Sequence, residues 1–307
     1  MTNPPLILGT RGSPLALAQA SLVADALEQA HGWARGTVRI LPVRTSGDRI
    51  QDRPLAEVGG KALWTKELDL ALLARDSDLS VHSMKDVESE RPQSLLIAAM
   101  LPRADFRDRL IGAGSITELA DGAIVGTSSP RRAAQLRRIR PDLRPVSIRG
   151  NVDTRLAKRE AGEVDATLLA AAGLDRLGRG DVGVAIPIDQ MLPAPAQGAV
   201  GIECRADDKR TAALLRSIDH WETSAAVAAE RAFTLALGGT CHSPVAALAL
   251  VKEGRIAFRC EILSEDGADH LFEQAVFPIG DLAAPAALAR KMLAAAPASI
   301  RRLFDCE

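Results

Sequence analysis

Two stretches of the chain share one pattern, an apolar strand that runs through a glycine turn into a helix. They are Leu6-Ile7-Leu8-Gly9-Thr10-Arg11-Gly12-Ser13-Pro14 and Ala123-Ile124-Val125-Gly126-Thr127-Ser128-Ser129-Pro130-Arg131-Arg132. Ser13 and Ser129 suit the N-cap, and the proline after each suits the first helical position. A glycine turn at a helix N-terminus directs backbone N–H groups and the positive end of the helix dipole at one place, which favours an anion. The sequence therefore predicts two similar halves, each with one anion site.

Arginines accompany both anion sites. Arg11 lies beside the first, and the guanidinium fork suits a carboxylate or a phosphate. Arg131 and Arg132 fall in the first turn of a predicted helix, where the dipole disfavours cations, and a bound polyanion would explain them. Arg149 and Arg155 flank another loop that enters a helix and are candidates for the same role. A solvated helix face is the expectation for the remaining arginines of this region: Arg137, Arg138, Arg140 and Arg159.

The order of predicted elements repeats between the halves. In each half a strand and its anion site lead into a helix, and a later helix turns into a short buried strand. The first half has predicted strands at 6–8, 38–43 and 79–82 with helices at 14–30 and about 65–75, and the second has helix 152–161 and strand 166–170. Matched units in the same order predict two α/β domains with parallel-rich sheets.

The C-terminal part follows a different pattern. A strongly helical stretch at 223–237 leads into a glycine-rich turn that contains Cys241. A hairpin, a third strand and a closing helix follow, at 245–251 with 255–263, at 271–277 and at 282–295. This order is typical of a small α+β domain.

Composition excludes several classes of protein. The chain has 307 residues, more than one core usually holds, and its net charge of −1 argues against a general nucleic-acid binder. No apolar run approaches the roughly 20 residues that span a bilayer. Met1-Thr2-Asn3-Pro4-Pro5 lacks the features of a signal peptide, so we expect a cytoplasmic protein. The four cysteines form no C-x-x-C pair, which argues against disulfides and a zinc site, and we expect no bound metal.

Two segments hold candidates for chemistry. Ser83-Met84-Lys85-Asp86 follows a short buried strand, and loops at strand C-termini line the ligand crevice of open α/β sheets. If this loop lines such a crevice, Asp86 is a general acid or base and Lys85 contacts an anion. A simple ion pair between the two side chains at the rim of the crevice explains the two charges as well. Cys241 lies in a loop, where a thiol is reachable, although an inert exposed thiol fits the local sequence equally well. Cys204 and Cys260 lie in predicted strands and should simply pack.

Further motifs complete a set that covers most of the chain. The set consists of Thr10-Arg11-Gly12-Ser13-Pro14-Leu15-Ala16-Leu17, Gly59-Gly60-Lys61, Val81-His82-Ser83-Met84-Lys85-Asp86-Val87, Gly126-Thr127-Ser128-Ser129 with Arg131-Arg132, Arg149-Gly150-Asn151-Val152 with Thr154-Arg155-Leu156, Ala172-Gly173-Leu174 with Arg176-Leu177-Gly178, Gln197-Gly198-Ala199-Val200-Gly201-Ile202-Glu203-Cys204-Arg205, Glu230-Arg231-Ala232-Phe233, and Gly239 with Cys241 and Pro244. In order and spacing it resembles the porphobilinogen deaminase family, also called hydroxymethylbilane synthase.

The resemblance implies an activity and a cofactor. The activity is that of a transferase of porphyrin and heme biosynthesis, which condenses four porphobilinogen molecules head to tail into hydroxymethylbilane and releases ammonia. The cofactor is one dipyrromethane per chain, bound through a thioether to Cys241, and the product is built on it. The implied fold class is α/β, with two domains like periplasmic binding proteins and a C-terminal α+β domain. The expected domains are residues 1–100 with 199–218, residues 101–198, and residues 219–307.

The resemblance also assigns roles to residues at matching positions. Asp86 matches the catalytic carboxylate. Besides Cys241, the matching cofactor-binding residues are Ser83, Lys85, Thr127, Ser128, Ser129, Arg131 and Arg132. The matching substrate-binding residues are Arg11, Ser13, Gln19, Lys61, Arg149, Arg155, Arg176 and Gln197. The chain departs from the family pattern at Glu88, where proline is common, and at Ala196, where glycine is usual.

Two other functions stay open as alternatives. A non-catalytic two-lobed binding protein for a small polycarboxylate would explain the twin anion sites, but not a third domain that carries Cys241. A phosphate-handling enzyme would explain the arginines, but the chain has no glycine-rich loop that ends in Lys-Ser or Lys-Thr. The expected partner is porphobilinogen, with no nucleic acid and no membrane. We expect a monomer that hands its product transiently to the next enzyme of the pathway.

Overall fold

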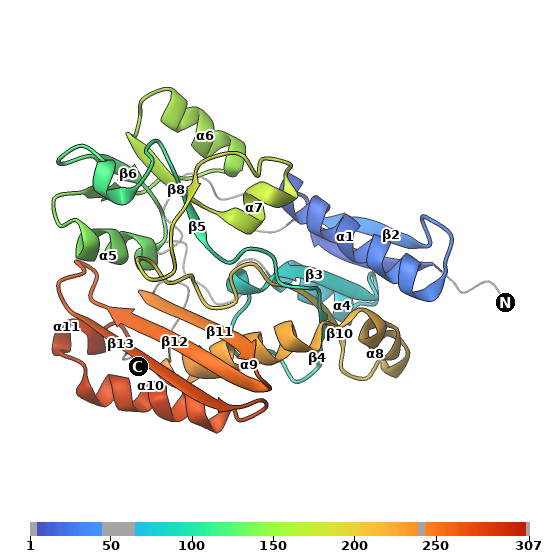
Figure 1. Ribbon diagram of the computed structural model, residues 1–307. Helices are drawn as coiled ribbons and strands as arrows, with labels where there is room; N and C mark the ends of the chain where they lie inside the picture. The colour runs from blue at the N-terminus through green and yellow to red at the C-terminus, as the bar shows by residue number, and fades with distance from the viewer. Residues whose placement is uncertain (1–4, 45–64, 239–242, 305–307) are drawn as a thin grey trace. The chain divides into compact units, whose positions relative to one another are not determined.

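The structure, a computed structural model, describes residues 5–44, 65–238 and 243–304 (Figure 1). It separates into two compact units, residues 1–104 with 199–224 and residues 105–198 with 225–307. The first unit is therefore discontinuous in sequence. The expected three-domain boundaries remain a prediction, since they divide the second unit further.

The first unit is built on one five-stranded sheet. Its strands and helices are β1 (Leu6–Arg11), α1 (Pro14–His31), β2 (Val38–Val43), α4 (Lys66–Leu73), β3 (Leu79–Ser83), the 3-10 turn η1 (Met84–Asp86), β4 (Leu95–Met100), β10 (Val200–Arg205), α8 (Lys209–Leu215) and the 3-10 turn η3 (Arg216–Ile218). The strand order is β2-β1-β3-β10-β4. β2, β1 and β3 run parallel, whereas β10 pairs antiparallel with β3 and β4.

Helices cover both faces of this sheet. Leu8 and Val81 point to the face covered by α1 and α8, where they pack with Leu27 and Leu215 in one buried cluster. Because side chains alternate along a strand, His82 points to the opposite face. α4 lies on that second face, which therefore carries the charged side chains discussed below.

The second unit contains a sheet of the same plan. Its elements are β5 (Asp108–Ile111), the 3-10 turn η2 (Ile116–Glu118), β6 (Ile124–Gly126), α5 (Pro130–Ile139), β7 (Arg144–Val146), α6 (Val152–Glu160), β8 (Ala166–Ala170), α7 (Ala171–Arg176) and β9 (Val184–Ala185). The strand order is β7-β6-β8-β5-β9, with β7, β6 and β8 parallel and β5 antiparallel to β8 and β9.

The predicted fold class and the parallel-rich sheets are confirmed, and each sheet also contains one antiparallel strand. In each sheet the fourth strand comes from outside the repeated βαβ pattern. β5 lies before the second repeat, and β10 follows it and returns to the first sheet. Each of them enters its sheet in the opposite direction, which the repeat alone did not indicate.

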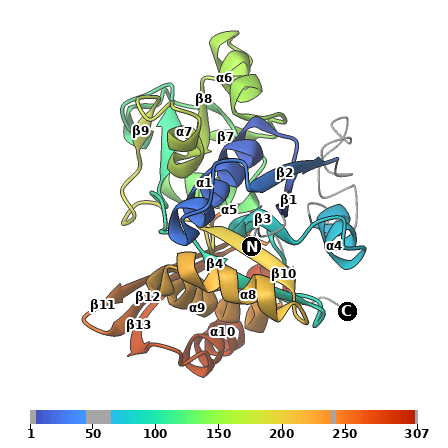
Figure 2. The same cartoon turned by 90° about the vertical axis from the view of Figure 1, so that its right-hand side faces the viewer.

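A three-stranded antiparallel sheet completes the second unit. Its elements are α9 (Trp221–Leu237), β11 (Val245–Lys252), β12 (Arg255–Leu263), β13 (His270–Pro278), α10 (Ala283–Ala295) and α11 (Ala298–Arg301). α9 and α10 lie along one face (Figures 1 and 2), where Phe233 and Met292 pack with Phe258 of β12. Leu192 packs on the other face against Ala246 and Leu248 of β11.

Local signals in the sequence were reliable at the helix ends. The Ser13 hydroxyl accepts the Ala16 N–H at 3.3 Å and the Ser129 hydroxyl accepts the Arg132 N–H at 3.4 Å, with proline in the first turn of both helices. Both predicted N-caps are therefore confirmed. Cys204 and Cys260 are buried and free, as expected for packed thiols.

Candidate active site

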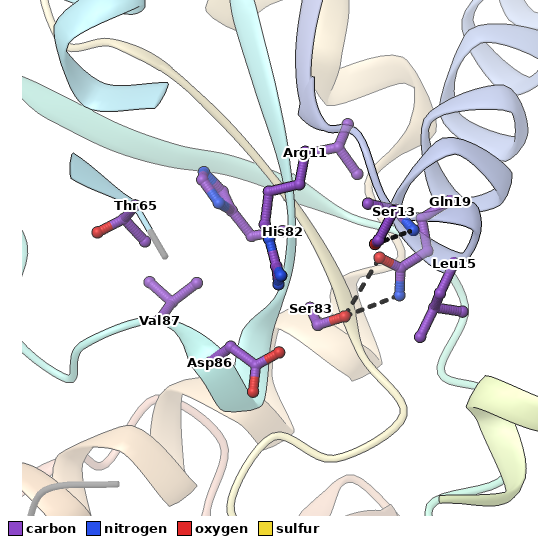
Figure 3. A pocket seen from close by; sticks show the side chains of 11 residues that line it. Arg11, Ser13, Leu15, Gln19, Thr65, His82, Ser83, Asp86 and Val87 are labelled. Atoms are coloured by element: carbon purple, nitrogen blue, oxygen red, sulfur yellow. Dashed lines mark hydrogen bonds between the residues drawn. The ribbon is translucent and has the colours of Figure 1, made fainter. Parts of the chain in front are cut away.

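The first predicted anion site lies at a pocket in the first unit (Figure 3). Its lining includes predicted site residues from two strand ends and one helix: Arg11, Ser13, Gln19, Ser83 and Asp86. In Figure 3 the Arg11 side chain extends from the end of β1 toward Ser83 and Asp86. Gln19 Nε2 donates to Ser83 Oγ at 2.9 Å, which ties α1 to the end of β3. The pocket also contains the N-terminus of α1, so its backbone and side chains favour a negatively charged ligand.

The turn that carries Asp86 is shaped by packing against β10. β3 ends at Ser83, and the 3-10 turn of Met84–Asp86 begins there. Met84 is 1% exposed and packs onto Gly201, where an added Cβ would overlap its sulfur. The Met84 N–H donates to Ala199 O at 3.1 Å. With Met84 buried, Lys85 is exposed and Asp86 is half-buried at the pocket.

A cluster of charged side chains, centred on Arg91, adjoins this turn through Glu88, and the sequence analysis missed it. Arg91 forms ion pairs with Asp69, Glu88 and Glu203, and Glu203 also lies 3.0 Å from His82. Burial alone would raise the pKa of Glu203, but His82 and Arg91 outweigh it and lower the pKa to about 2. The cluster was missed because these residues are far apart in sequence, and only Glu203 and His82 belonged to quoted motifs.

The second predicted anion site, at the start of α5 in the second unit, consists of buried arginines. Arg131 and Arg132 start α5 as predicted, but both are buried, and they share one buried carboxylate, that of Asp108. The distances are 2.8 Å from Arg131 Nη1 and 2.6 Å from Arg132 Nη2. Burial raises the pKa of Asp108, but the two guanidinium charges and their hydrogen bonds prevail and hold it well below its usual range.

Asp108 gives the two arginines a partner within the chain, which the sequence analysis did not foresee. A bound polyanion is therefore not the only reason for cations at this helix start. One carboxylate nevertheless offsets only one of the two charges. The Nε atoms of Arg131 and Arg132 are buried and have no hydrogen-bond partner within the described ranges. Burial and the neighbouring Arg132 lower the pKa of Arg131, despite Asp108.

Gln197, predicted as a substrate contact, belongs to the same cluster. Its Nε2 donates to Asp108 Oδ1 and to Phe106 O, both at 2.8 Å. Ala196, just before it, has a φ of 60°, a left-handed conformation that favours glycine. Its N–H donates to Glu230 Oε2 at 2.5 Å, and Glu230 Oε1 accepts the Ala249 N–H at 2.7 Å. The buried Glu230 carboxylate therefore joins the segment before Gln197 to β11.

The other predicted residues of the second unit lie around the loops that enter α5 and α6. Thr127 Oγ1 accepts the Ser129 N–H at 3.2 Å, and Ser128 Oγ donates to Ile148 O at 2.6 Å. Arg155 Nε donates to Gly150 O at 3.0 Å, across the loop that also holds Arg149.

Arg176 is half-buried at the end of α7. Its Nη2 donates to Gly198 O at 2.7 Å, and burial lowers its pKa.

Two of the arginines expected on a solvated helix face also contact the C-terminal sheet region, and a third forms ion pairs at the surface. Arg138 pairs with the buried Glu261 at 3.0 Å and Arg137 Nη1 donates to Glu265 O at 2.8 Å, so both join α5 to the C-terminal sheet region. Arg140 pairs with Asp121 and Asp142. These partners follow Arg137 and Arg138 by more than a hundred residues, beyond the reach of a local pattern.

Two predicted site residues, Lys61 and Cys241, lie outside the described residues. Over the described ranges, no group of three or more His, Cys, Asp or Glu side chains is arranged to hold a metal ion. Within the same ranges, no helix has the length and apolar character that crossing a membrane requires.

Solved structures with a similar fold are distant. An ABC transporter periplasmic substrate-binding protein from Coxiella burnetii has a TM-score of 0.42 at 14% identity, covering 69% of this chain and 91% of that one. A TRAP periplasmic solute binding protein from Desulfovibrio salexigens has a TM-score of 0.44 at 10% identity, covering 73% of each chain. These scores are low, and the fold class rests on the sheet topology given above.

Family models and proteins of similar sequence match this chain much more closely. Residues 6–213 match the family model "Porphobilinogen deaminase, dipyromethane cofactor binding domain", and residues 224–295 match "Porphobilinogen deaminase, C-terminal domain". The porphobilinogen deaminase of Sphingopyxis alaskensis is 58% identical over 98% of this chain and 96% of its own length. That of Paracoccus denitrificans is 49% identical over 96% and 95%. The predicted family, enzyme activity and dipyrromethane cofactor are thereby confirmed: the chain belongs to the porphobilinogen deaminase family.

Proposed function

We propose that the two anion sites serve this activity in different ways, with the pocket of the first unit at the reacting groups and the arginine cluster of the second at cofactor carboxylates. The observation that carries the proposal is that Asp86 shares a pocket with Arg11 and the N-terminus of α1. A general acid or base is thus held beside a place that attracts a carboxylate. Porphobilinogen carries both a carboxylate-bearing periphery and an amine that must leave.

Asp86 is assigned the proton transfers. Its carboxylate is half-buried, so it can accept pyrrole N–H bonds and stabilise the cation that forms when ammonia leaves the substrate. The same group assists proton transfer to the leaving amine and away from the new carbon–carbon bond. Arg11, which lines the same pocket, binds a substrate carboxylate. Gln19 and Ser83 keep the wall between α1 and β3 in place through their hydrogen bond.

Dipyrromethane supplies the nucleophilic pyrrole end on which the product is extended, and the residues of the second unit suit its carboxylates. Arg131 and Arg132 share only one carboxylate, and their buried Nε atoms have no hydrogen-bond partner in the described part of the chain. An anionic group placed there would meet excess positive charge at low dielectric. We assign Ser129, Lys85 and Cys241 to the cofactor, and Arg149, Arg155 and Arg176 to carboxylates of the substrate.

The experiment is intact-mass analysis with a turnover assay. We expect the purified protein to carry an adduct of two pyrrole units, and Cys241→Ser to lack both the adduct and the activity. Cys204→Ser and Cys260→Ser are matched controls that should keep the adduct. Burial raises the pKa of Cys204 to about 11 and that of Cys260 to about 12, so neither thiol offers much thiolate. A bare polypeptide mass with full activity would refute the assignment.

We infer further that the protein is a cytoplasmic monomer that passes hydroxymethylbilane to the next enzyme. The buried free thiols of Cys204 and Cys260 are typical of a reducing compartment. A monomer should give a mass near 32.5 kDa by size exclusion with light scattering. The three-domain division given above belongs to the same proposal and is supported by one separate sheet for each domain.

A further inference from the structure

The charged cluster around Arg91 has no part in the proposed reaction, yet its central side chain is fully hydrogen-bonded. Its centre is Arg91, whose side chain is 9% exposed. A guanidinium has five N–H donors, and the acceptors around Arg91 match that number. Nε and Nη2 lie 2.9 Å from the two oxygens of Glu203, and Nη2 lies 2.5 Å from Asp69 Oδ1. Nη1 lies 2.9 Å from Glu88 Oε2 and 3.3 Å from Thr65 Oγ1.

These acceptors come from separate elements of the first unit. Glu203 lies on β10, Asp69 on α4, and Thr65 directly before α4. Arg91 itself belongs to the segment that follows the Asp86 turn. Its hydrogen bonds therefore fasten that segment to the central sheet and to the helix on the second face.

Glu88 is the member of the cluster nearest to Asp86, two residues along the chain. Its Oε2 accepts from Arg91 Nη1 and also from Thr65 Oγ1, at 3.1 Å. Between Glu88 and Asp86 lies Val87, which is buried and whose N–H donates to Met84 O at 3.3 Å. The turn is thus held at its start by β3 and at its end by Glu88, so a shift of Glu88 would be passed to Asp86.

The Arg91–Glu203 pair at the centre of the cluster is ionic, whereas burial raises the pKa of Asp69 despite the nearby Arg91. Burial lowers the pKa of Arg91, but its pairs with Glu203 and Asp69 outweigh burial and raise it. The pKa of Glu203 stays far below neutral. Charge-assisted hydrogen bonds are stronger than neutral ones, and the bidentate Arg91–Glu203 pair also fixes the orientation of the guanidinium.

We propose that Glu88 and Arg91 are positioning residues for Asp86, which hold the 84–88 segment in the geometry that proton transfer requires. The proposal rests on the function assigned to Asp86 above. A misplacement of a catalytic group by about 1 Å can cost as much as about 100-fold in rate. Removing the Glu88 carboxylate releases the link nearest to Asp86 and leaves Arg91 bound to Glu203 and Asp69, so folding should survive.

The test compares Glu88→Ala and Glu88→Gln with a matched control, Asp208→Ala. Like Glu88, Asp208 forms an ion pair with a buried arginine three residues away, in this case Arg205 at 2.7 Å. Arg205 lies opposite Leu95 at one end of β10, whereas Ser83, which precedes the Asp86 turn, lies opposite the other end. Asp208 also caps α8 through the Thr211 N–H, so its loss should cost at least as much stability. Turnover is measured per cofactor-loaded molecule, counted by intact mass, together with KM and the melting midpoint.

We expect Glu88→Ala to lower kcat by about tenfold or more and to change KM by less than about threefold, because positioning affects the transition state. Glu88→Gln keeps an oxygen for Arg91 and Thr65 and should restore kcat to within about threefold. Asp208→Ala should lower the melting midpoint with kcat within about twofold of the wild type. The positioning role is overturned if Glu88→Ala keeps its kcat, or if both alanine variants lose kcat in proportion to stability.

A double-mutant cycle supplies a readout that a merely structural role would not move. If Glu88 acts through Asp86, Glu88→Ala should change the single-turnover rate of Asp86→Asn by less than about twofold. A full, additive loss in that background overturns the proposal. The turnover of the wild type distinguishes this proposal from the proposed function. If the wild type is active and Glu88→Ala has the same turnover, only the positioning role is overturned.

Discussion

Asp108→Asn is the substitution whose cost the structure defines most sharply. The Asp108 carboxylate is fully buried and accepts from Arg131 at 2.8 Å, from Arg132 at 2.6 Å and from Gln197 at 2.8 Å. Asparagine keeps the shape, but it removes the charge and turns an amide NH2 toward guanidinium donors. Two buried cations then lose their shared carboxylate, and breaking a buried pair in this way costs about 3–5 kcal/mol.

The loss should appear as a lower melting midpoint of the second unit. For a unit of this size 1 kcal/mol corresponds to about 2–4 °C, so we expect a fall of about 10 °C by calorimetry. Hydrogen exchange at β5 and β8 assigns the transition to this unit. Asp121→Asn is the control, because Asp121 pairs with Arg140 at 3.1 Å from a fully exposed position, and its midpoint should move by less than about 1 °C.

The outcome also has a pH dependence with a definite sign. The pKa of Asp108 is depressed in the folded protein, so its contribution is complete above the ordinary carboxyl range and is lost only as the pH falls through the depressed value. The difference between wild type and Asp108→Asn should therefore persist in mild acid. Equal midpoints for Asp108→Asn and Asp121→Asn at neutral pH would refute the reasoning.

Two further predictions concern the first unit. Asp86→Asn keeps a hydrogen-bond acceptor but loses charge and basicity, so turnover should fall by about 10²–10⁴-fold with an unchanged melting curve; near-normal turnover of the purified variant would contradict the assigned role. Glu203 has its pKa lowered from 4.5 to about 2 in the folded state, so its contribution is present above the unfolded value and is lost as the pH falls between the two. The free energy of unfolding of Glu203→Gln in urea should accordingly be lower than that of the wild type at neutral pH, and should decrease less between neutral pH and about pH 3. An equally steep decrease for the variant and the wild type would contradict the proposed ion pairs of Glu203.

Much of the local structure could be predicted, because its causes are local. The helix starts at Ser13 and Ser129 depend on side chains within three residues, and the structure has both caps. The 38–43, 166–170 and 255–263 strands were predicted with the observed bounds, since alternating or continuous apolar runs define them. Local reasoning also brought Asp86 into consideration as a residue after a strand, and Arg11 as a residue beside the helix start at Ser13.

The partners of buried charges could not be predicted in this way. Nothing in the sequence near Arg131 indicates that Asp108, on a short strand before the second repeat, would be its counter-ion. Nothing in the sequence near Arg91 indicates its partners, yet it joins side chains from β10 and α4. Ala196 adopts a left-handed conformation that its sequence alone disfavours, held by a hydrogen bond to Glu230.

By itself the sequence determined the repeated strand–turn–helix plan, the helix caps, the candidate thiol and the family, because these depend on neighbouring residues or on motifs in order. Only the tertiary structure decided that β5 and β10 enter their sheets antiparallel, that Asp108 lies between two arginines, and that a buried guanidinium anchors the segment after Asp86. The physical reason is that a charge can be buried only where its partners converge, and residues far apart in sequence meet only through the fold.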